Sequence, residues 1–233
     1  MTSREGTTVR SIDADFVRPT ARQLETFAAI GAATAHEAMG RRGALASAIK
    51  PIRRGTPLLG PAFPAAGRPG DNLTLHAALA LAQPGDVLVY SVDGFADGAS
   101  FGDVMAEAAR AKGIAGVVID GAARDGNVLR ELGLPVYARG LSLKSRGDKA
   151  FLGPLAEPVI VGGVRVAPGD LVIGDDDGVV VVPLAELDAV AAASQARERK
   201  EADLRRRLAA GEVTTWDLFG PAALARKGID VDI

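Results

Sequence analysis

The chain has 233 residues, an apolar content of 48%, a charged content of 24% and a formal net charge of −2. This composition is typical of a globular protein of one or two domains and offers no general attraction for nucleic acid. The absence of cysteine excludes disulfides, thiolate zinc sites and cysteine nucleophiles. With His36 and His76 as the two histidines, a histidine-rich metal site is excluded and a Ser-His-Asp triad is disfavoured. Carboxylates and water would therefore have to hold any metal, which favours Mg²⁺ or Mn²⁺.

The N-terminal stretch MTSREGTTVRSIDADF is polar and contains no apolar signal region. No run approaches the roughly 20 apolar residues that a membrane-spanning helix needs. We therefore expect a cytoplasmic protein without a membrane partner.

The first ninety residues predict helices and short strands. In chain order these are a helix over 20–29, a helix from Thr34 to Gly40, strands near 49–52 and 62–65, a helix over 73–82 and a strand over 87–92. Thr20 with Gln23, and Thr34 with Glu37, have capping-box spacing, and Asp71 is placed to cap the third helix.

The segment FGDVMAEAARAKGIAGVVIDGAARD is the most informative part of the chain. It predicts a helix over 104–111 that begins after Gly102 and ends at Gly113, then a strand over 115–119. Gly121 is expected to allow a sharp turn before Arg124-Asp125. The end of this strand and the start of the helix would meet at one edge of a sheet. Carboxylates, a guanidinium and free backbone N–H groups would then lie close together, as a dication and an anionic substrate require.

The second half predicts further helices and hairpins. These are a helix ending at Leu132 with Gly133 as its stop, a strand over 136–138, four short strands within 157–183, and a long helix over 184–210 closed by Gly211. We expect a single domain over 1–233 with a mixed, layered α/β fold. Residues 184–233 would form an oligomerisation arm, because the tail carries Trp216, Leu218 and Phe219 on a projecting element.

Arg124 and Asp125 admit two interpretations. Asp125 with substrate oxygens and water would suit Mg²⁺, and Arg124 would stabilise an enolate oxygen that develops on a 2-oxo acid. The N–H groups of residues 102–105 would hold the substrate carboxylate at the positive end of the helix. Alternatively, the Arg-Asp pair braces a loop through an ion pair, and Asp103 is an ordinary acidic residue at a helix start.

Four other features favour structural roles. His36 lies in a capping box, and His76 is expected to be a core or rim histidine. Asp175-Asp176-Asp177-Gly178 lacks EF-hand spacing and is typical of a hairpin turn. The charged run over 197–207 is typical of a solvated face, unless Glu201 or Glu198 reaches a neighbouring subunit's site.

At these residues the chain resembles the 4-hydroxy-4-methyl-2-oxoglutarate/4-carboxy-4-hydroxy-2-oxoadipate aldolase family of the RraA-like superfamily. The matching motifs are GAATAHEAMGRRGALASAIKPI, RPGDNLTLHAALALAQPGDVLV, FGDVMAEAARAKGIAGVVIDGAARD, PVYARG, PGDLVIGDDDGVVVVP and ARERKEADLRRRLAAGE. The resemblance implies an α/β/β/α swivelling-domain-like sandwich, assembled as trimers or hexamers with sites between subunits. It also implies a divalent-metal pyruvate aldolase that often decarboxylates oxaloacetate.

The resemblance also implies the role of each site residue. Asp125 would ligate the metal, Asp103 would hold a metal-bound water, and Arg124 would stabilise the pyruvate enolate. The substrate carboxylate would bind the amides of Gly102, Asp103, Val104 and Met105. Glu201 of a neighbouring subunit, in preference to Glu198, would complete the metal site through water.

The chain departs from the family pattern at Val128, where an acidic residue is often found, and in the stretch SVDGFADGASFG, which is richer in small and acidic residues. The alternative function is that of a non-catalytic RraA-like regulator that binds a ribonuclease. That regulator type commonly lacks the aspartate at position 125, and this chain keeps it.

Overall fold

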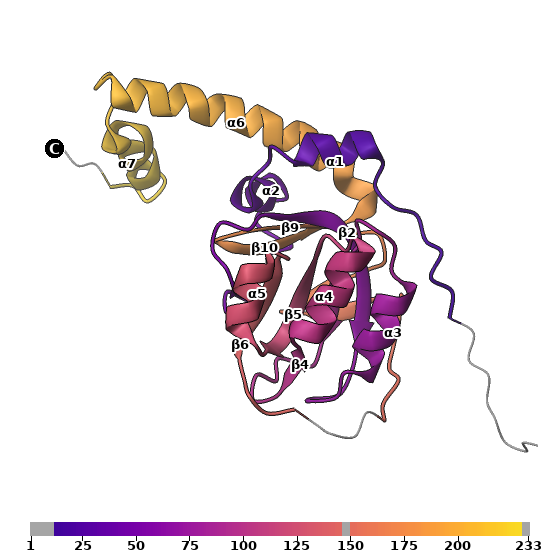
Figure 1. The fold of residues 1–233 in the computed structure, drawn as a ribbon. Coiled ribbons are helices and arrows are strands. Elements are labelled where there is room, and N and C mark those ends of the chain that lie inside the picture. Colours follow the sequence, from indigo (N-terminus) through magenta and orange to yellow (C-terminus); the bar gives the residue numbers. More distant parts are fainter. Residues whose placement is uncertain (1–11, 146–149, 230–233) are drawn as a thin grey trace, which may run out of the picture.

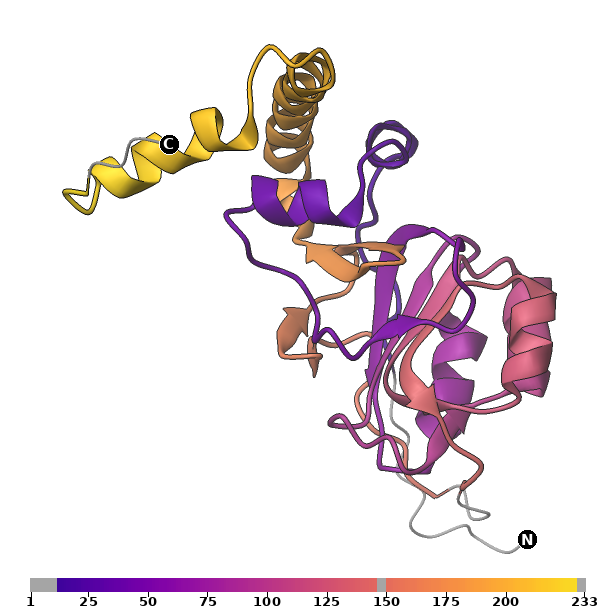
Figure 2. The same cartoon turned by 90° about the vertical axis from the view of Figure 1, so that its left-hand side faces the viewer.

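The computed structural model describes residues 12–145 and 150–229, and Figures 1 and 2 show its arrangement. A mixed sheet has the strand order β1-β6-β5-β3-β2-β9-β10, and β4 pairs with β5. The strands are β1 (Lys50–Pro51), β2 (Leu58–Ala66), β3 (Val87–Ser91), β4 (Ala99–Phe101), β5 (Gly116–Ala123), β6 (Val136–Leu141), β9 (Leu171–Asp175) and β10 (Gly178–Val182). The two end strands approach each other, since Lys50 Nζ on β1 donates to the carbonyl of Asp177 beside β10. The sheet is therefore nearly closed.

The parallel part of the sheet consists of β2, β3, β5 and β6. Helices α3 (Leu73–Leu81), α4 (Asp103–Lys112) and α5 (Gly126–Leu132) connect successive strands and cover one face (Figure 1). Successive residues of β3 face opposite sides of the sheet. Leu88 packs with the helices, and the next residue, Val89, packs with the antiparallel strands. Burial on both faces accounts for the continuous apolar run of β3.

The antiparallel strands form the next layer. Strands β9 and β10 pair with each other, and β7 (Val159–Val161) and β8 (Val164–Val166) form a separate two-stranded sheet. Their valines pack against the parallel strands in one apolar cluster. Helices α1 (Ala21–Phe27), α2 (Ala32–Ala38) and the start of α6 (Leu187–Ala209) cover the outer side of β9 and β10. This order of layers confirms the predicted α/β/β/α sandwich with a long C-terminal helix.

The structure corrects two local predictions. Helix α2 begins at Ala32, so Thr34 lies inside it and donates to Glu198 Oε1 at 2.7 Å, while Asp175 Oδ2 accepts from the Ala32 N–H. Strand β5 continues through Gly121 to Ala123 without a sharp turn. A Cβ at Gly121 would lie 2.4 Å from Val92 Cγ2, so this glycine permits close strand packing.

Other local predictions are confirmed. Thr20 and Gln23 form a capping box, and Gly113 and Gly133 adopt left-handed conformations at the ends of α4 and α5. Asp175 to Gly178 forms the β9–β10 turn.

The tail beyond Gly211 contains an additional helix, α7 (Thr215–Ala225), which the sequence analysis did not predict. Helices α6 and α7 extend away from the sheet (Figure 2). Trp216 and Phe219 on this arm are 37% and 61% exposed. Within the two described ranges, no helix is long and apolar enough to cross a membrane. The polar segment 1–11 lies outside those ranges, and the assignment of 1–233 to a single domain stays a prediction.

Candidate active site

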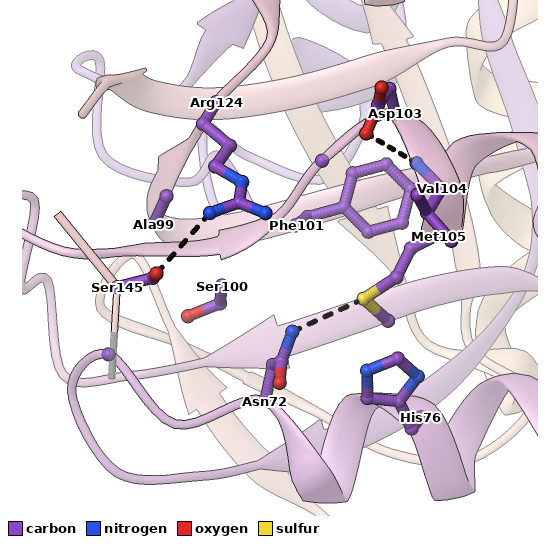
Figure 3. Close-up of a pocket in the computed structure, with 12 residues that line it drawn as sticks. Asn72, His76, Ala99, Ser100, Phe101, Asp103, Val104, Met105, Arg124 and Ser145 are labelled. Atoms are coloured by element: carbon purple, nitrogen blue, oxygen red, sulfur yellow. Dashed lines mark hydrogen bonds between the residues drawn. The ribbon is translucent and has the colours of Figure 1, made fainter. Parts of the chain in front are cut away.

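Of the predicted site residues, Asp103, Arg124 and Asp125 meet where β4 and β5 end and α4 and α5 begin. A pocket of about 290 Å³ opens there (Figure 3). Its lining residues are Gly70, Asn72, His76, Ala99, Ser100, Phe101, Gly102, Asp103, Val104, Met105, Arg124 and Ser145. The structure therefore brings together Arg124 and all four predicted carboxylate-binding positions, 102–105. In open α/β sheets, ligands commonly bind outside the carboxyl ends of the strands.

Gly102 brings the start of α4 close to Arg124 and Asp125. A Cβ at this position would lie 2.6 Å from Asp125 Oδ2 and 3.1 Å from Arg124 Cγ. The backbone N–H of Asp103 donates to Asp125 Oδ2 at 3.3 Å, and the N–H of Val104 donates to Asp103 Oδ1 at 2.7 Å. The first amides of α4 therefore already face carboxylates, as expected of a helix start that attracts anions.

Arg124 and Asp125 follow β5 on a tightly held turn. The N–H of Arg124 donates to the carbonyl of Phe101 at 2.9 Å, which joins this turn to β4. Asp125 has a φ of 57° and caps α5 without a side-chain bond to that helix. A left-handed conformation is costly for a residue with a Cβ and often marks a functional position. The turn leaves the Asp125 side chain available at the surface of the site.

The loop-bracing interpretation describes only part of this geometry. Arg124 Nε and Asp125 Oδ2 do form an ion pair, at 3.3 Å. Arg124 Nη1 also donates to Ser145 Oγ at 3.3 Å, and the two charged side chains remain 46% and 34% exposed. The guanidinium points into the pocket (Figure 3), where a small anion can reach it.

A second cavity, of about 430 Å³, lies on the other side of the Arg124–Asp125 turn. Asp103 and Arg124 line both cavities, whereas Asp125 lines the second one. Val128, at the position where the family often has an acid, also lines the second cavity and is 41% exposed. The departure at Val128 therefore removes a charge close to Asp125.

The residues present fit a partial magnesium site. Within the described residues, no group of three or more His, Cys, Asp or Glu side chains could hold a metal. Asp103 and Asp125 nevertheless lie together, with Asp125 Oδ2 held 3.3 Å from the Asp103 nitrogen. Mg²⁺ keeps several waters and commonly binds through one or two carboxylates plus substrate oxygens. Two neighbouring carboxylates are compatible with such an ion, and water, substrate or other groups would have to complete its coordination.

Glu201 and Glu198 do not line either cavity in this chain. Glu201 forms ion pairs with Arg197 and Arg205 at 2.7 and 3.4 Å. Helix α6 lies at the opposite end of the sheet from the α4 start (Figure 1). A role for Glu201 therefore depends on a second copy of the chain.

The sequence analysis missed Asn72, Ser100 and Ser145 as pocket residues. Asn72 lies in a matching motif and Ser100 in the stretch SVDGFADGASFG, but neither was assigned to the site, because the pocket joins three separate segments that only the fold brings together. His76, predicted as a core or rim histidine, lines the pocket. His36 lies elsewhere, with Nδ1 2.9 Å from the carbonyl oxygen of Arg42, which fits its predicted structural role.

Comparison with known proteins assigns the chain to a family. Residues 32–181 match the RraA-like family, described as Aldolase/RraA. The chain belongs to the RraA-like family. A protein of Halalkalibacterium halodurans, named as a candidate 4-hydroxy-4-methyl-2-oxoglutarate aldolase, is 38% identical over 159 residues, which cover 68% of this chain and 74% of that protein.

Solved structures share the RraA-like fold of this chain. Streptomyces coelicolor RraAS2, described as an unusual member of the RNase ES inhibitor RraA family, superposes with a TM-score of 0.73 at 33% identity, covering 82% of this chain and 100% of that one. An uncharacterised protein from Pseudomonas syringae gives a TM-score of 0.76 at 28% identity, covering 87% and 98%. These relatives include both an aldolase name and a ribonuclease-inhibitor name, so the family alone does not decide the activity.

Proposed function

We propose that this RraA-like protein is a divalent-metal-dependent lyase. It cleaves 4-hydroxy-2-oxo acids, of the 4-hydroxy-4-methyl-2-oxoglutarate or 4-carboxy-4-hydroxy-2-oxoadipate type, to pyruvate and a second oxo acid, and it decarboxylates oxaloacetate. The observation that carries the proposal is the shared position of Arg124, Asp125 and the start of α4. The Asp125 carboxylate lies 3.3 Å from both the Arg124 Nε and the Asp103 nitrogen.

Each residue has a defined role in this proposal. Asp125 ligates Mg²⁺ or Mn²⁺ directly, and Asp103 and Glu201 of a neighbouring subunit support the ion through water. When bound, the ion supplies positive charge that polarises the 2-oxo group. The amides of residues 102–105 hold the substrate carboxylate, and Arg124 donates to the 2-oxo oxygen. The guanidinium keeps its positive charge at any physiological pH.

The same residues serve both reactions. In the aldol cleavage, the 4-hydroxyl proton passes to a water held by Asp103, and the electrons of the C3–C4 bond move onto the 2-oxo oxygen beside Arg124. In oxaloacetate, loss of CO₂ sends the electrons of the broken bond to the same oxygen and requires no base. One pocket therefore gives the pyruvate enolate from both substrates.

The proposal is tested by coupling pyruvate release to lactate dehydrogenase. Oxaloacetate and 4-hydroxy-4-methyl-2-oxoglutarate are supplied with Mg²⁺ or Mn²⁺, and then with EDTA. We expect pyruvate from both substrates and its loss on chelation. Full activity in EDTA would contradict metal dependence, and no pyruvate from either acid would contradict the lyase assignment.

A ribonuclease-binding function is the second candidate, because RraAS2 belongs to a ribonuclease-inhibitor family. Asp125 distinguishes the two functions. A regulator does not need this carboxylate, so Asp125→Asn would leave ribonuclease inhibition intact. Measured inhibition of an RNase E-type enzyme that survives this substitution, without pyruvate release by the wild type, would favour the regulator.

A further inference from the structure

The Arg124 pocket contains a buried hydroxyl group that forms no bond in the described part of the chain. Ser100 is the central residue of β4 and is 1% exposed. Its Oγ has no hydrogen-bond partner there. An unsatisfied buried hydroxyl destabilises a folded protein, so it calls for an explanation. Because Ser100 lines the pocket beside Arg124, a ligand can provide the missing partner.

Two more neutral polar side chains lie on the same side of the pocket. Asn72 donates weakly to the sulfur of Met105 at 3.5 Å, and Ser145 accepts from Arg124. Figure 3 shows Ser100, Asn72 and Ser145 on one side of the guanidinium, with Asp103 on the other. Strand β4, which carries Ser100, is joined directly to the segment that carries Ser145. The N–H of Ala99 donates to the carbonyl of Lys144 at 2.7 Å.

The position of Asn72 is fixed by its neighbour. The Asp71 carboxylate accepts from the N–H of Leu73 at 2.8 Å and from those of Ala150 and Phe151 at 3.0 Å. These bonds hold the start of α3 against the segment that follows residue 149. Asn72 and Ser100 therefore face the pocket from elements that packing keeps in place.

The two ends of the pocket differ in chemistry. The end with Asp103 and the α4 amides suits the 2-oxo acid group, and Asp103 also lines the second cavity, where the proposed metal ligand Asp125 lies. The end with Ser100 offers hydroxyl and amide donors that suit a second oxygen-bearing group. Serine has a single side-chain torsion with three staggered positions, so the hydroxyl can turn towards a ligand at little cost.

On the basis of the proposed function, we propose that Ser100 is a specificity-determining residue. Its hydroxyl donates to the distal carboxylate of the substrate, with the Asn72 amide as a second donor. The pocket therefore selects compact 2-oxo diacids over 2-oxo monoacids.

Calorimetric titration of the metal-loaded protein with two unreactive ligands tests this role. Oxalate occupies only the end with Arg124 and the α4 amides. The second ligand, 2-oxoglutarate, adds a distal carboxylate and lacks the 4-hydroxyl that cleavage requires. We expect Ser100→Ala to weaken 2-oxoglutarate binding by about tenfold, the typical effect of one hydrogen bond to a charged group, and to leave oxalate binding unchanged.

A matched control separates this role from general packing. Ser91 is also a buried strand serine and does not line the pocket, so Ser91→Ala should leave both affinities unchanged. The thermal midpoint of unliganded Ser100→Ala should be no lower than that of the wild type, because the substitution removes an unsatisfied hydroxyl.

Three results would overturn the inference. Unchanged 2-oxoglutarate binding by Ser100→Ala, with oxalate still bound, would remove the role of Ser100 and leave the proposed function standing. Equal weakening of both ligands together with a lower midpoint would show a structural role instead. Failure of the wild type to bind oxalate would overturn the proposed function, and this inference with it.

Discussion

The site end of the molecule and the helical arm at its other end differ in how many of their residues are buried. At the site end, every residue of β4 and β5 is buried, and the α4 start is held against the Arg124–Asp125 turn by the bond from the Asp103 N–H to the Asp125 carboxylate. At the other end, α7 has no buried residue. Helix α6 buries three residues of its first turns, Leu187, Val190 and Ser194, and none beyond them.

Because of this difference, we expect substitutions at the two ends of the molecule to have different effects on activity and on oligomeric state. Asp103, Arg124 and Asp125 are positioned by packing within one chain, so substitutions of these residues should change activity without changing the oligomeric state. Trp216 and Phe219 on the arm are exposed in the single chain, and exposed apolar residues of this kind commonly mark a protein–protein contact. Substitutions on the arm should therefore change assembly first and activity through it.

The largest expected effect is that of Arg124→Ala. Loss of a donor to a developing oxyanion typically lowers kcat by about 100- to 1,000-fold. Arg110→Ala is the control, because Arg110 is exposed on α4 and pairs with Glu107 away from the pocket. Steady-state pyruvate release measures both variants. Near wild-type turnover by Arg124→Ala would remove its role.

Gly102→Ala should lower the rate of pyruvate release, because the added methyl group crowds Asp125 and Arg124. The added Cβ would lie 2.6 Å from Asp125 Oδ2, so the carboxylate and the guanidinium must both move. Displacement of catalytic groups by about 1 Å can cost on the order of 100-fold in rate. Gly140→Ala is the matched control, since a Cβ there meets nothing within 4 Å. Equal rates for the two variants would show that the close approach at Gly102 is dispensable.

The double variant Trp216→Ala/Phe219→Ala tests the arm. We expect the protein to form smaller assemblies, measured by light scattering, because both side chains are exposed on the single chain. If Glu201 of a neighbour supports the ion, activity per chain should fall by about 10- to 100-fold, as for other groups that support metal ligands. Ile160→Ala, at an exposed site on β7, is the control. An unchanged mass would contradict the assembly role.

Thr214→Ala should have the smallest effect. Thr214 and Asp217 form the capping box of α7, and loss of such a cap costs about 1 kcal/mol of helix stability. Because α7 buries no side chain, the loss should appear as faster hydrogen exchange in α7 and not as a lower global unfolding midpoint. A clear fall in that midpoint would show that α7 supports the core.

The sequence predicted the elements around the proposed site well where the signal is local. The helix predicted over 104–111 is observed over Asp103–Lys112 with its end at Gly113, because helix-forming residues and the glycine cap act over a few residues. Because parallel strands end at the same edge of a sheet, this local pattern also predicted the convergence of Asp103 and Arg124.

The predictions were incomplete where the signal is not local. Strand β4 is three residues long, lies in a stretch rich in glycine and aspartate, and is held by bonds to distant segments, namely β5 and Lys144. Ser100 was missed for this reason. At Gly121, strand pairing outweighs the turn preference of glycine, and at Thr34 the cap of α2 comes from the distant Asp175.

The most direct test of the account is a crystal structure with Mg²⁺ and pyruvate at millimolar concentrations. We expect the ion on the Asp125 carboxylate, and the keto oxygen of pyruvate within hydrogen-bond distance of the Arg124 guanidinium. An empty site, or a structure in which the two side chains turn away from the bound pyruvate, would contradict the account.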